Sequence, residues 1–250
     1  MNEANDGTRP TVSAVICALN EASNLPRVLP LIPGCVDELI LVDGGSTDGT
    51  VEVARRLRPD VRVLRQEGKG KGVALRQGIE AARGDIIVTL DADGETDPRD
   101  LPAFVARLRE GHDFVKGSRF ADGWRNKPAH RLLGNWLIVT ACNLLFGTRF
   151  TDLCSGYNAF RRDVPRRVDI WDEGGWNYEP LIVARLLRAG LDVVEQPHGY
   201  EGRLGEESKL SSWGQGLKTM LVLLRERFRR TGRLPRGSEV SDERAVREQG

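Results

Sequence analysis

Residues 85–95, with the sequence DIIVTLDADGE, decide the fold that we expect for this chain. The run of β-branched and apolar side chains over residues 86–90 is typical of a strand that is buried on both faces. Two carboxylates, Asp91 and Asp93, follow this strand directly, and a third is present at Glu95. Because open α/β sheets bind their ligands at the carboxyl ends of the strands, we expect these acids to lie in a binding site.

The acids after this strand suit a hard divalent cation. An Asp-x-Asp pattern with further oxygen donors close by is typical of a Mg²⁺ or Mn²⁺ site that bridges phosphates, rather than of a zinc site. The alternative is that the acids only cap the next helix, because Asp97 and Pro98 form a favourable helix start. Capping accounts for Asp97 in either case. It does not explain Asp91 and Asp93, and we therefore favour a site.

Outward from this strand, the first half of the chain alternates between strand and helix patterns. Strands are predicted at residues 11–17, 38–42, 61–65 and 86–90, and helices at 24–31, 51–57, 73–82 and 101–109. Repeated β-α units with short loops predict an α/β fold with a mostly parallel central sheet and helices on both faces. Two common nucleotide-binding motifs do not occur in the sequence: Gly68, Gly70 and Gly72 do not continue as G-x-G-x-x-G, and there is no P-loop.

Composition limits the function further. The chain has 250 residues, which is enough for one large domain with a substantial core. Its 37 Lys and Arg nearly balance 36 Asp and Glu, so we expect no nucleic-acid partner. No stretch approaches the ~18 apolar residues of a membrane span. The cysteines have no metal-type spacing and predict reduced thiols in a cytoplasmic protein; they are Cys17, Cys35, Cys142 and Cys154.

The C-terminal region indicates contact with a surface. We expect a loose tail over residues 1–10, a folded domain over 11–212, a basic amphipathic helix over 213–236 and a disordered tail over 237–250. Residues 213–236 contain seven basic side chains and one glutamate. The apolar residues at helical spacing are Trp213, Leu217, Met220, Leu221, Leu224 and Phe228. Such a helix either binds peripherally to the cytoplasmic face of a membrane or packs on the domain with its charged edge in solvent, and both alternatives stay open. Residues 132–146 are a second candidate for an interfacial helix.

Several loops, read together, resemble a known family. The segments ALNEA (18–22), VDGGSTDGT (42–50), GKG (70–72) and DAD (91–93) have the order and spacing of family 2 glycosyltransferases of the GT-A (Rossmann-like) fold. Three later segments resemble the dolichyl/polyprenyl-phosphate mannose synthase branch: KGSRF (116–120), DLCSGYNAF (152–160) and GEESKL (205–210). The resemblance covers about residues 11 to 225, nearly the whole of the expected folded part.

The resemblance implies a GDP- or UDP-linked nucleotide-sugar donor and a Mg²⁺ or Mn²⁺ cofactor. It implies that the donor is bound by Leu19, Glu21, Asp43, Lys71, Asp91, Ala92 and Asp93. Asp93 matches a direct metal ligand, and Glu95 stands where the mannose synthases often have a ligating Gln. The family usually has a second Asp at the position of Gly44, so the nucleotide base is not carried over. For Glu21 the alternative is a helix N-terminal acid that interacts with the helix dipole.

The resemblance also implies an acceptor and a catalytic set. Arg119, Arg131 and Asn135 match residues that hold a polyprenyl phosphate, and Arg203 and Lys209 match residues that close over the diphosphate. The implied catalytic residues are Asp91, Asp93, Arg203 and Lys209, and Trp176, Tyr178 and Glu179 are candidates to flank the sugar. Guanidinium groups suit phosphate geometry. A solvated surface charge is the alternative for any single arginine.

We therefore expect a metal-dependent inverting transfer of a hexose, of the mannose or glucose type, to a polyprenyl phosphate. A phosphate with a second pKa of ~6 is already a nucleophile at neutral pH and needs no base. A neutral hydroxyl acceptor, as on a soluble metabolite, would need a carboxylate base, for which Glu179 and Asp152 are candidates. Two other classes stay open: a haloacid-dehalogenase-type phosphatase, whose D-x-D-G-T motif residues 91–96 resemble, and a non-catalytic binding module.

Overall fold

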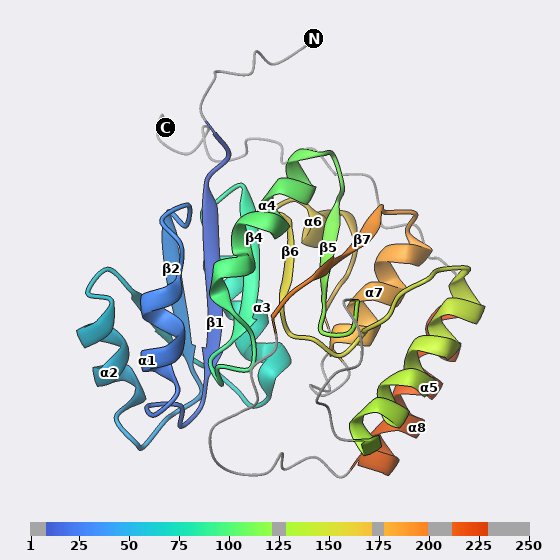
Figure 1. Cartoon of the computed structure of the whole chain (residues 1–250), viewed down its shortest axis with the longest axis horizontal. Helices are drawn as coiled ribbons and strands as arrows, with labels where there is room; N and C mark the ends of the chain where they lie inside the picture. Colours follow the sequence, from blue (N-terminus) through green and yellow to red (C-terminus); the bar gives the residue numbers. More distant parts are fainter. Residues whose placement is uncertain (1–8, 122–128, 172–177, 200–211, 230–250) are drawn as a thin grey trace, which may run out of the picture.

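The computed structural model describes residues 9–121, 129–171, 178–199 and 212–229 of the chain (Figure 1). Its strands are β1 (Val12–Ala18), β2 (Glu38–Asp43), β3 (Arg62–Arg65), β4 (Ile86–Asp91), β5 (Phe114–Ser118), β6 (Asn158–Arg161) and β7 (Val193–Pro197). Its α-helices are α1 (Leu25–Val28), α2 (Thr50–Leu57), α3 (Lys71–Ala81), α4 (Leu101–Arg109), α5 (Ala129–Phe146), α6 (Val164–Arg167), α7 (Tyr178–Arg188) and α8 (Ser212–Phe228). Two 3₁₀ turns, η1 (Leu29–Leu31) and η2 (Pro98–Asp100), complete the elements.

The strands form one seven-stranded sheet in the order β3-β2-β1-β4-β6-β5-β7. The strands β1 to β4 are mutually parallel, as the β-α alternation predicts. Strand β6 runs antiparallel to both β4 and β5, and β7 is parallel to β5. The prediction of a mostly parallel α/β sheet is therefore confirmed, while the three strands of the second half were not among those predicted.

Alternating side chains of the central strands fill two separate cores. On β1, Ala14 and Ile16 face the layer that contains α1, α2 and α4, whereas Val15 faces the layer that contains α3, α5 and α7. Each of these three side chains is fully buried. Burial on both faces explains why the central strands have continuous apolar sequences rather than alternating ones. Helices therefore cover both faces of the sheet, as expected.

The first predicted helix differs from the observed structure. Residues 24–31 form the short α1 followed by η1, because Pro30 has no N–H to donate and interrupts regular helical hydrogen bonding. Asn24 precedes α1 but does not cap it with its side chain; its Nδ2 donates instead to Glu21 Oε2 at 2.6 Å. Asp97 does cap η2, since its carboxylate accepts from the Arg99 N–H at 2.9 Å.

Helix α8 lies beside α5 at one end of the molecule (Figure 1). Its inner face is fixed by Leu223, which is fully buried, and by Glu226, which is ion-paired with Arg185 and Arg188 of α7. Leu221 and Phe228 on the other side are 57% and 75% exposed. The helix thus packs on the domain and also presents an apolar outer face. Among the described residues, no helix is long and apolar enough to cross a membrane.

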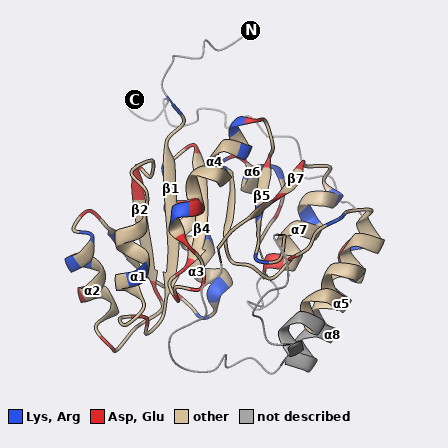
Figure 2. Ribbon diagram, in the orientation of Figure 1, with Lys and Arg blue, Asp and Glu red and all other residues tan. Residues whose placement is uncertain are grey.

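Charged residues are spread over both halves of the fold. Figure 2 shows lysine and arginine on helices at both ends of the sheet, interleaved with acids, rather than in one continuous stripe. This distribution agrees with the near balance of charges in the sequence.

Candidate active site

The carboxyl ends of three neighbouring strands place the predicted acids at one edge of the sheet. Asp91 ends β4 and pairs in register with Cys17 of β1, while Asp43 ends β2 and pairs with Ala18. Because these strands are parallel, both acids lie at the same edge, the lower one in the view of Figure 1. This is the edge at which open α/β sheets bind ligands.

The acidic segment after β4 keeps an alternating pattern of exposure. Ala92, Gly94 and Thr96 are buried, whereas Asp91, Asp93 and Glu95 are partly exposed. The three acids therefore turn to the accessible side of this segment. The Asp93 carboxylate also accepts from the Glu95 N–H at 3.0 Å, which ties the two candidate metal ligands together.

Lys71 connects the acids of β4 to the second half of the fold. Its Nζ lies 2.8 Å from Asp91 Oδ1 and 2.7 Å from Glu179 Oε1. Burial alone would lower the pKa of Lys71, but the two neighbouring carboxylates hold that pKa well above its usual value. Lys71 is therefore a permanent cation between two acids at the predicted donor site.

Gly156 lies close against the Lys71–Asp91 ion pair. A Cβ on Gly156 would lie 2.2 Å from Asp91 Oδ2 and 2.9 Å from Lys71 Nζ. Even a Cβ at position 156 would therefore force the Asp91 carboxylate and the Lys71 ammonium to move.

The other predicted donor residues surround the ends of β1 and β2. Leu19 is 57% exposed at the end of β1. The Asp43 carboxylate accepts from the N–H groups of Gly45 and Ser46 at 3.1–3.2 Å, so it shapes its own loop. Glu21 is buried and accepts from Asn24. Ala92 is buried as well. The donor roles of all four remain predictions.

Gly44 stands in a confined position of the same loop. A Cβ there would lie 3.3 Å from both Gln66 Oε1 and Leu19 Cβ, and 3.4 Å from the Ala18 carbonyl oxygen. An aspartate at this position, as the family usually has, would need these neighbours to shift by a few tenths of an ångström.

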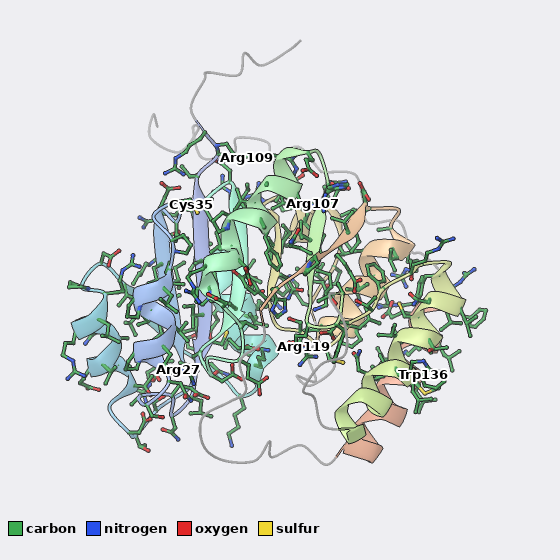
Figure 3. The ribbon with its side chains drawn as sticks, in the orientation of Figure 1. Arg27, Cys35, Arg107, Arg109, Arg119 and Trp136 are labelled. Atoms are coloured by element: carbon green, nitrogen blue, oxygen red, sulfur yellow. The ribbon has the colours of Figure 1, made fainter. Side chains whose placement is uncertain are left out.

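The predicted acceptor residue Arg119 forms a buried ion pair with Asp152. Arg119 Nε lies 2.7 Å from Asp152 Oδ2, and a second guanidinium nitrogen lies 3.1 Å from Oδ1. Burial alone would raise the pKa of Asp152, but Arg119 lowers that pKa to about 2. Asp152 is therefore a carboxylate at every pH at which the protein would work. Figure 3 shows Arg119 toward the same edge as the β4 acids.

Asn135, the other predicted acceptor residue with a described side chain, supports the chain next to this pair. Its Nδ2 donates to the Thr151 carbonyl at 3.0 Å, and it is only 5% exposed. Glu195 of β7 adds support, since it accepts from the N–H groups of Thr151 and Asp152 at 2.8 and 2.9 Å. Asn135 thus positions the Asp152 segment. The side chains of Arg131 and Tyr178 and the whole of Arg203, Lys209 and Trp176 lie outside the described residues.

Two buried cationic or titratable side chains near the site were not predicted from the sequence. Lys116 is fully buried and donates to the Ser155 carbonyl, and burial lowers its pKa. His198 accepts from the Ser155 hydroxyl through Nε2 at 2.9 Å and donates through Nδ1 to the Gly199 carbonyl at 2.8 Å. Burial lowers the pKa of His198 to about 4, which agrees with this neutral tautomer. Both residues hold the chain that leads to Gly156.

The donor set at this edge fits Mg²⁺ or Mn²⁺. Magnesium is usually bound by one or two carboxylates together with substrate phosphates, rather than by a complete cage of protein ligands. Asp93 and Glu95 supply two hard oxygen donors of this kind. Across the described parts of the chain, no cluster of three or more His, Cys, Asp or Glu side chains forms such a cage. Asp93 and Glu95 are therefore the described residues that could hold such a cation.

Comparisons with known proteins agree with this geometry. The family model described as Glycosyl transferase family 2 matches residues 13–168. The chain is 31% identical over 225 residues to a dolichyl-phosphate hexose transferase of Haloferax volcanii, and the alignment covers 87% of this chain and 96% of the relative. It is 33% identical over 215 residues to an undecaprenyl-phosphate mannosyltransferase of Micrococcus luteus, with 80% of this chain and 87% of the relative covered.

A solved structure supports the same assignment. Glucosyl-3-phosphoglycerate synthase of Mycobacterium tuberculosis, in complex with Mn²⁺, uridine diphosphate and phosphoglyceric acid, superposes with a TM-score of 0.69 at 26% identity, over 89% of this chain and 80% of that one. The expected GT-A fold and the resemblance to the polyprenyl-phosphate sugar synthase branch are confirmed, and the family match favours a glycosyltransferase over the phosphatase alternative. The chain is a glycosyltransferase, and it belongs to glycosyl transferase family 2.

Proposed function

We propose that this enzyme transfers a hexose from a nucleoside diphosphate sugar to a polyprenyl phosphate, with inversion at the anomeric carbon. The observation that supports a phosphate acceptor is the state of the two candidate bases. Asp152 is bound on both carboxylate oxygens by Arg119, and Glu179 is ion-paired with Lys71. A hydroxyl acceptor would need one of them to accept a proton, whereas a phosphate would not.

The pKa values favour the same acceptor. A carboxylate whose pKa is held at about 2, as that of Asp152 is, has little tendency to accept a proton near neutral pH. A phosphate monoester with a second pKa of ~6 is already a dianion there and attacks without help. Direct in-line displacement then converts an α-linked nucleotide sugar into a β-linked sugar phosphate.

The residues divide between the two substrates. In the proposal, Leu19, Glu21 and Asp43 bind the nucleoside, while Asp91 and Lys71 lie at the ribose and diphosphate. A Mg²⁺ or Mn²⁺ ion held by Asp93 and Glu95 would offset the charge of the leaving diphosphate. Arg203 and Lys209 would add cations to the diphosphate, and Arg119, Arg131 and Asn135 would hold or support the acceptor phosphate.

The relatives support a lipid acceptor by their names. A dolichyl-phosphate hexose transferase, an undecaprenyl-phosphate mannosyltransferase and a polyprenol monophosphomannose synthase are each 31–33% identical to this chain. Their names share a polyprenyl-phosphate substrate class; two of them name mannose and the third names only a hexose. We therefore propose the class and leave the hexose as mannose or glucose type.

A lipid acceptor would bring the enzyme to a membrane surface, and the apolar outer faces of α5 and α8 suit that contact. On α5, Trp136 and Leu144 are 51% and 81% exposed, and Trp136 lies on the outer side of the helix (Figure 3). On α8, Leu221 and Phe228 are exposed, and the Arg227 guanidinium lies against the Phe228 ring. Exposed aromatic and aliphatic side chains next to arginines are typical of helices that lie on a leaflet.

The second candidate is a soluble acceptor that carries a phosphate. The glucosyl-3-phosphoglycerate synthase structures contain phosphoglyceric acid as well as uridine diphosphate, in a fold that matches this chain at 26% identity. That neighbour favours the same donor chemistry with a small metabolite in place of the lipid.

The deciding experiment measures transfer by the purified enzyme with Mg²⁺ or Mn²⁺ and a panel of radiolabelled GDP- and UDP-sugars. Each donor is offered with a short polyprenyl phosphate, with 3-phosphoglycerate, or with neither. Label in the organic phase from one donor, lost in Asp93→Ala, supports the lipid acceptor and identifies the sugar. A labelled water-soluble phosphate ester would instead establish the second candidate. NMR of the product tests the stereochemistry, because a retained α anomer contradicts inversion.

A further inference from the structure

Glu179 forms a contact across the site that the proposed function does not use. It lies in the first turn of α7, in the second half of the fold, and its Oε1 lies 2.7 Å from Lys71 Nζ at the start of α3. The same ammonium lies 2.8 Å from Asp91 at the end of β4. The Lys71 ammonium therefore joins α3, β4 and α7, and Lys71 and Glu179 are 108 positions apart in the sequence.

Local preference does not explain a lysine at this place. Lys71 is the first residue of α3, where the positive end of the helix dipole disfavours a cation. Glu179, in the first turn of α7, is by contrast favoured by its helix end. The ammonium stays at the start of α3 because two carboxylates compensate its charge, and a role in binding accounts for that arrangement.

The ammonium has little freedom to leave. The Lys71 side chain is 33% exposed and the Glu179 side chain only 12%. On one side, Gly156 approaches so closely that even a Cβ there would lie 2.9 Å from Nζ. Glu179 is the more enclosed of the two acids, since the Asp91 side chain is 29% exposed. Asp91 is therefore the partner that a ligand reaches more easily.

We propose that Glu179 is a positioning residue for the donor. When the nucleotide sugar engages Asp91, Lys71 loses one of its two partners, and Glu179 keeps the ammonium at the edge of the sheet, next to the diphosphate. Without Glu179, Lys71 pairs with Asp91 alone and competes with the donor for that carboxylate. This inference rests on the donor half of the proposed function and is independent of the acceptor.

The sign of the effect separates this role from simple electrostatics. The described acids at this edge, Asp43, Asp91, Asp93, Glu95 and Glu179, outnumber the described cations placed there, Lys71 and Arg119. If Glu179 contributed only its charge, its neutralisation would strengthen the binding of a negatively charged diphosphate. If Glu179 positions Lys71, the same substitution weakens that binding.

The experiment measures binding of UDP and of GDP by isothermal titration calorimetry, with Mg²⁺ and without any acceptor. The variants are Glu179→Gln, which keeps the shape of the side chain, Lys71→Met, and the two combined. We expect Glu179→Gln to raise the Kd of the preferred nucleotide about tenfold, the scale of one lost charged hydrogen bond. In the Lys71→Met background the same change should have no further effect, because Glu179 acts through Lys71.

A matched control is Glu38→Gln, which removes a part-buried glutamate paired with Arg62 at the amino end of β2. It should leave the Kd unchanged, and thermal unfolding of each variant shows that it is folded. Unchanged or tighter nucleotide binding by Glu179→Gln, or additive effects in the double variant, would overturn the positioning role of Glu179 but leave the proposed function intact. A wild-type enzyme that binds neither UDP nor GDP overturns the donor half of the proposed function, and this inference with it.

Discussion

At the scale of single residues, Gly156 is the contact on which the donor edge depends most directly. In Gly156→Ala, the new Cβ would overlap with Asp91 Oδ2, 2.2 Å away, and crowd Lys71 Nζ at 2.9 Å. We expect kcat/KM to fall at least about a hundredfold because both charged groups are displaced, a loss typical of misplaced reacting groups. Steady-state kinetics of sugar transfer measure this.

The control for this prediction is Gly134→Ala. Gly134 lies within α5, and a Cβ there meets nothing within 4 Å. Alanine should leave transfer unchanged and stabilise the helix by about 0.5–1 kcal/mol. If Gly156→Ala were as active as Gly134→Ala, the close contact between Gly156 and Asp91 would not be needed for sugar transfer.

His198 gives a second prediction at this scale, for the pH dependence of stability. Its pKa falls from 6.5 to about 4 on folding because the ring is buried. Between these values the unfolded chain binds a proton that the folded chain does not, so the free energy of unfolding rises with pH over this window and falls as the solution is acidified. The full shift corresponds to about 3 kcal/mol.

Urea unfolding at pH 4.5 and 6.5 measures this effect when the wild type is compared with His198→Gln. The glutamine amide keeps an acceptor for the Ser155 hydroxyl but does not titrate. We expect the variant to lose less stability than the wild type on acidification. Equal losses would show that His198 does not titrate in this window.

At the scale of elements, α8 offers a test of its two faces. Leu223 is fully buried against α5 and α7, so Leu223→Ala should cost about 2–5 kcal/mol of unfolding free energy. Leu221 on the outer face is 57% exposed, and Leu221→Ser should leave the melting temperature nearly unchanged. If the outer face of α8 contacts a membrane, the double variant Leu221→Ser/Phe228→Ser should bind anionic vesicles more weakly in a flotation assay, whereas Leu223→Ala should not. Vesicle binding that survives it would argue against this surface.

The elements also show how far sequence patterns reach. Strands β1 to β4 were predicted because each is a local apolar run followed by a helical pattern, and this places Asp43, Asp91 and Asp93 at one edge. Strands β5 and β7 were not predicted, because β5 contains the buried Lys116 and β7 contains Glu195 and Gln196, which have no alternating apolar pattern. Lys116 and Glu195 form hydrogen bonds to backbone groups of residues 151–155. A short window of sequence does not contain these distant partners.

The same reason limits prediction of the site. Lys71 and Glu179 were each selected, but as separate donor and sugar contacts, because nothing local links positions 108 apart. Arg119 was selected for a phosphate, and its pairing with Asp152 appears only once β5 and the following loops are packed. Residues that lie at strand ends were predictable; partners that depend on tertiary packing were not.

At the scale of the whole molecule, the charge at the donor edge predicts a dependence on divalent cations. The acids there repel a diphosphate unless a cation compensates their charge. We expect UDP or GDP to raise the melting temperature with Mg²⁺ or Mn²⁺ and to lose most of this effect when EDTA is added. Differential scanning fluorimetry measures the shift, with the uncharged nucleosides as controls that EDTA should not affect. An equal shift in EDTA would contradict a metal-bridged diphosphate.

The antiparallel strand β6 has a consequence for synthesis of the chain. It pairs with β4 in the middle of the sheet, yet Asn158 lies 69 positions after its neighbour Thr89. During translation, β1 to β4 are complete long before β6 leaves the ribosome, so the edge of the mostly apolar strand β4 stays open in the nascent protein. Open edges of this kind template aggregation until they are covered. Ribosome-bound chains that end before residue 158 should therefore depend on chaperones for their solubility, and yield in a heterologous host should rise when translation is slowed or a holdase is supplied.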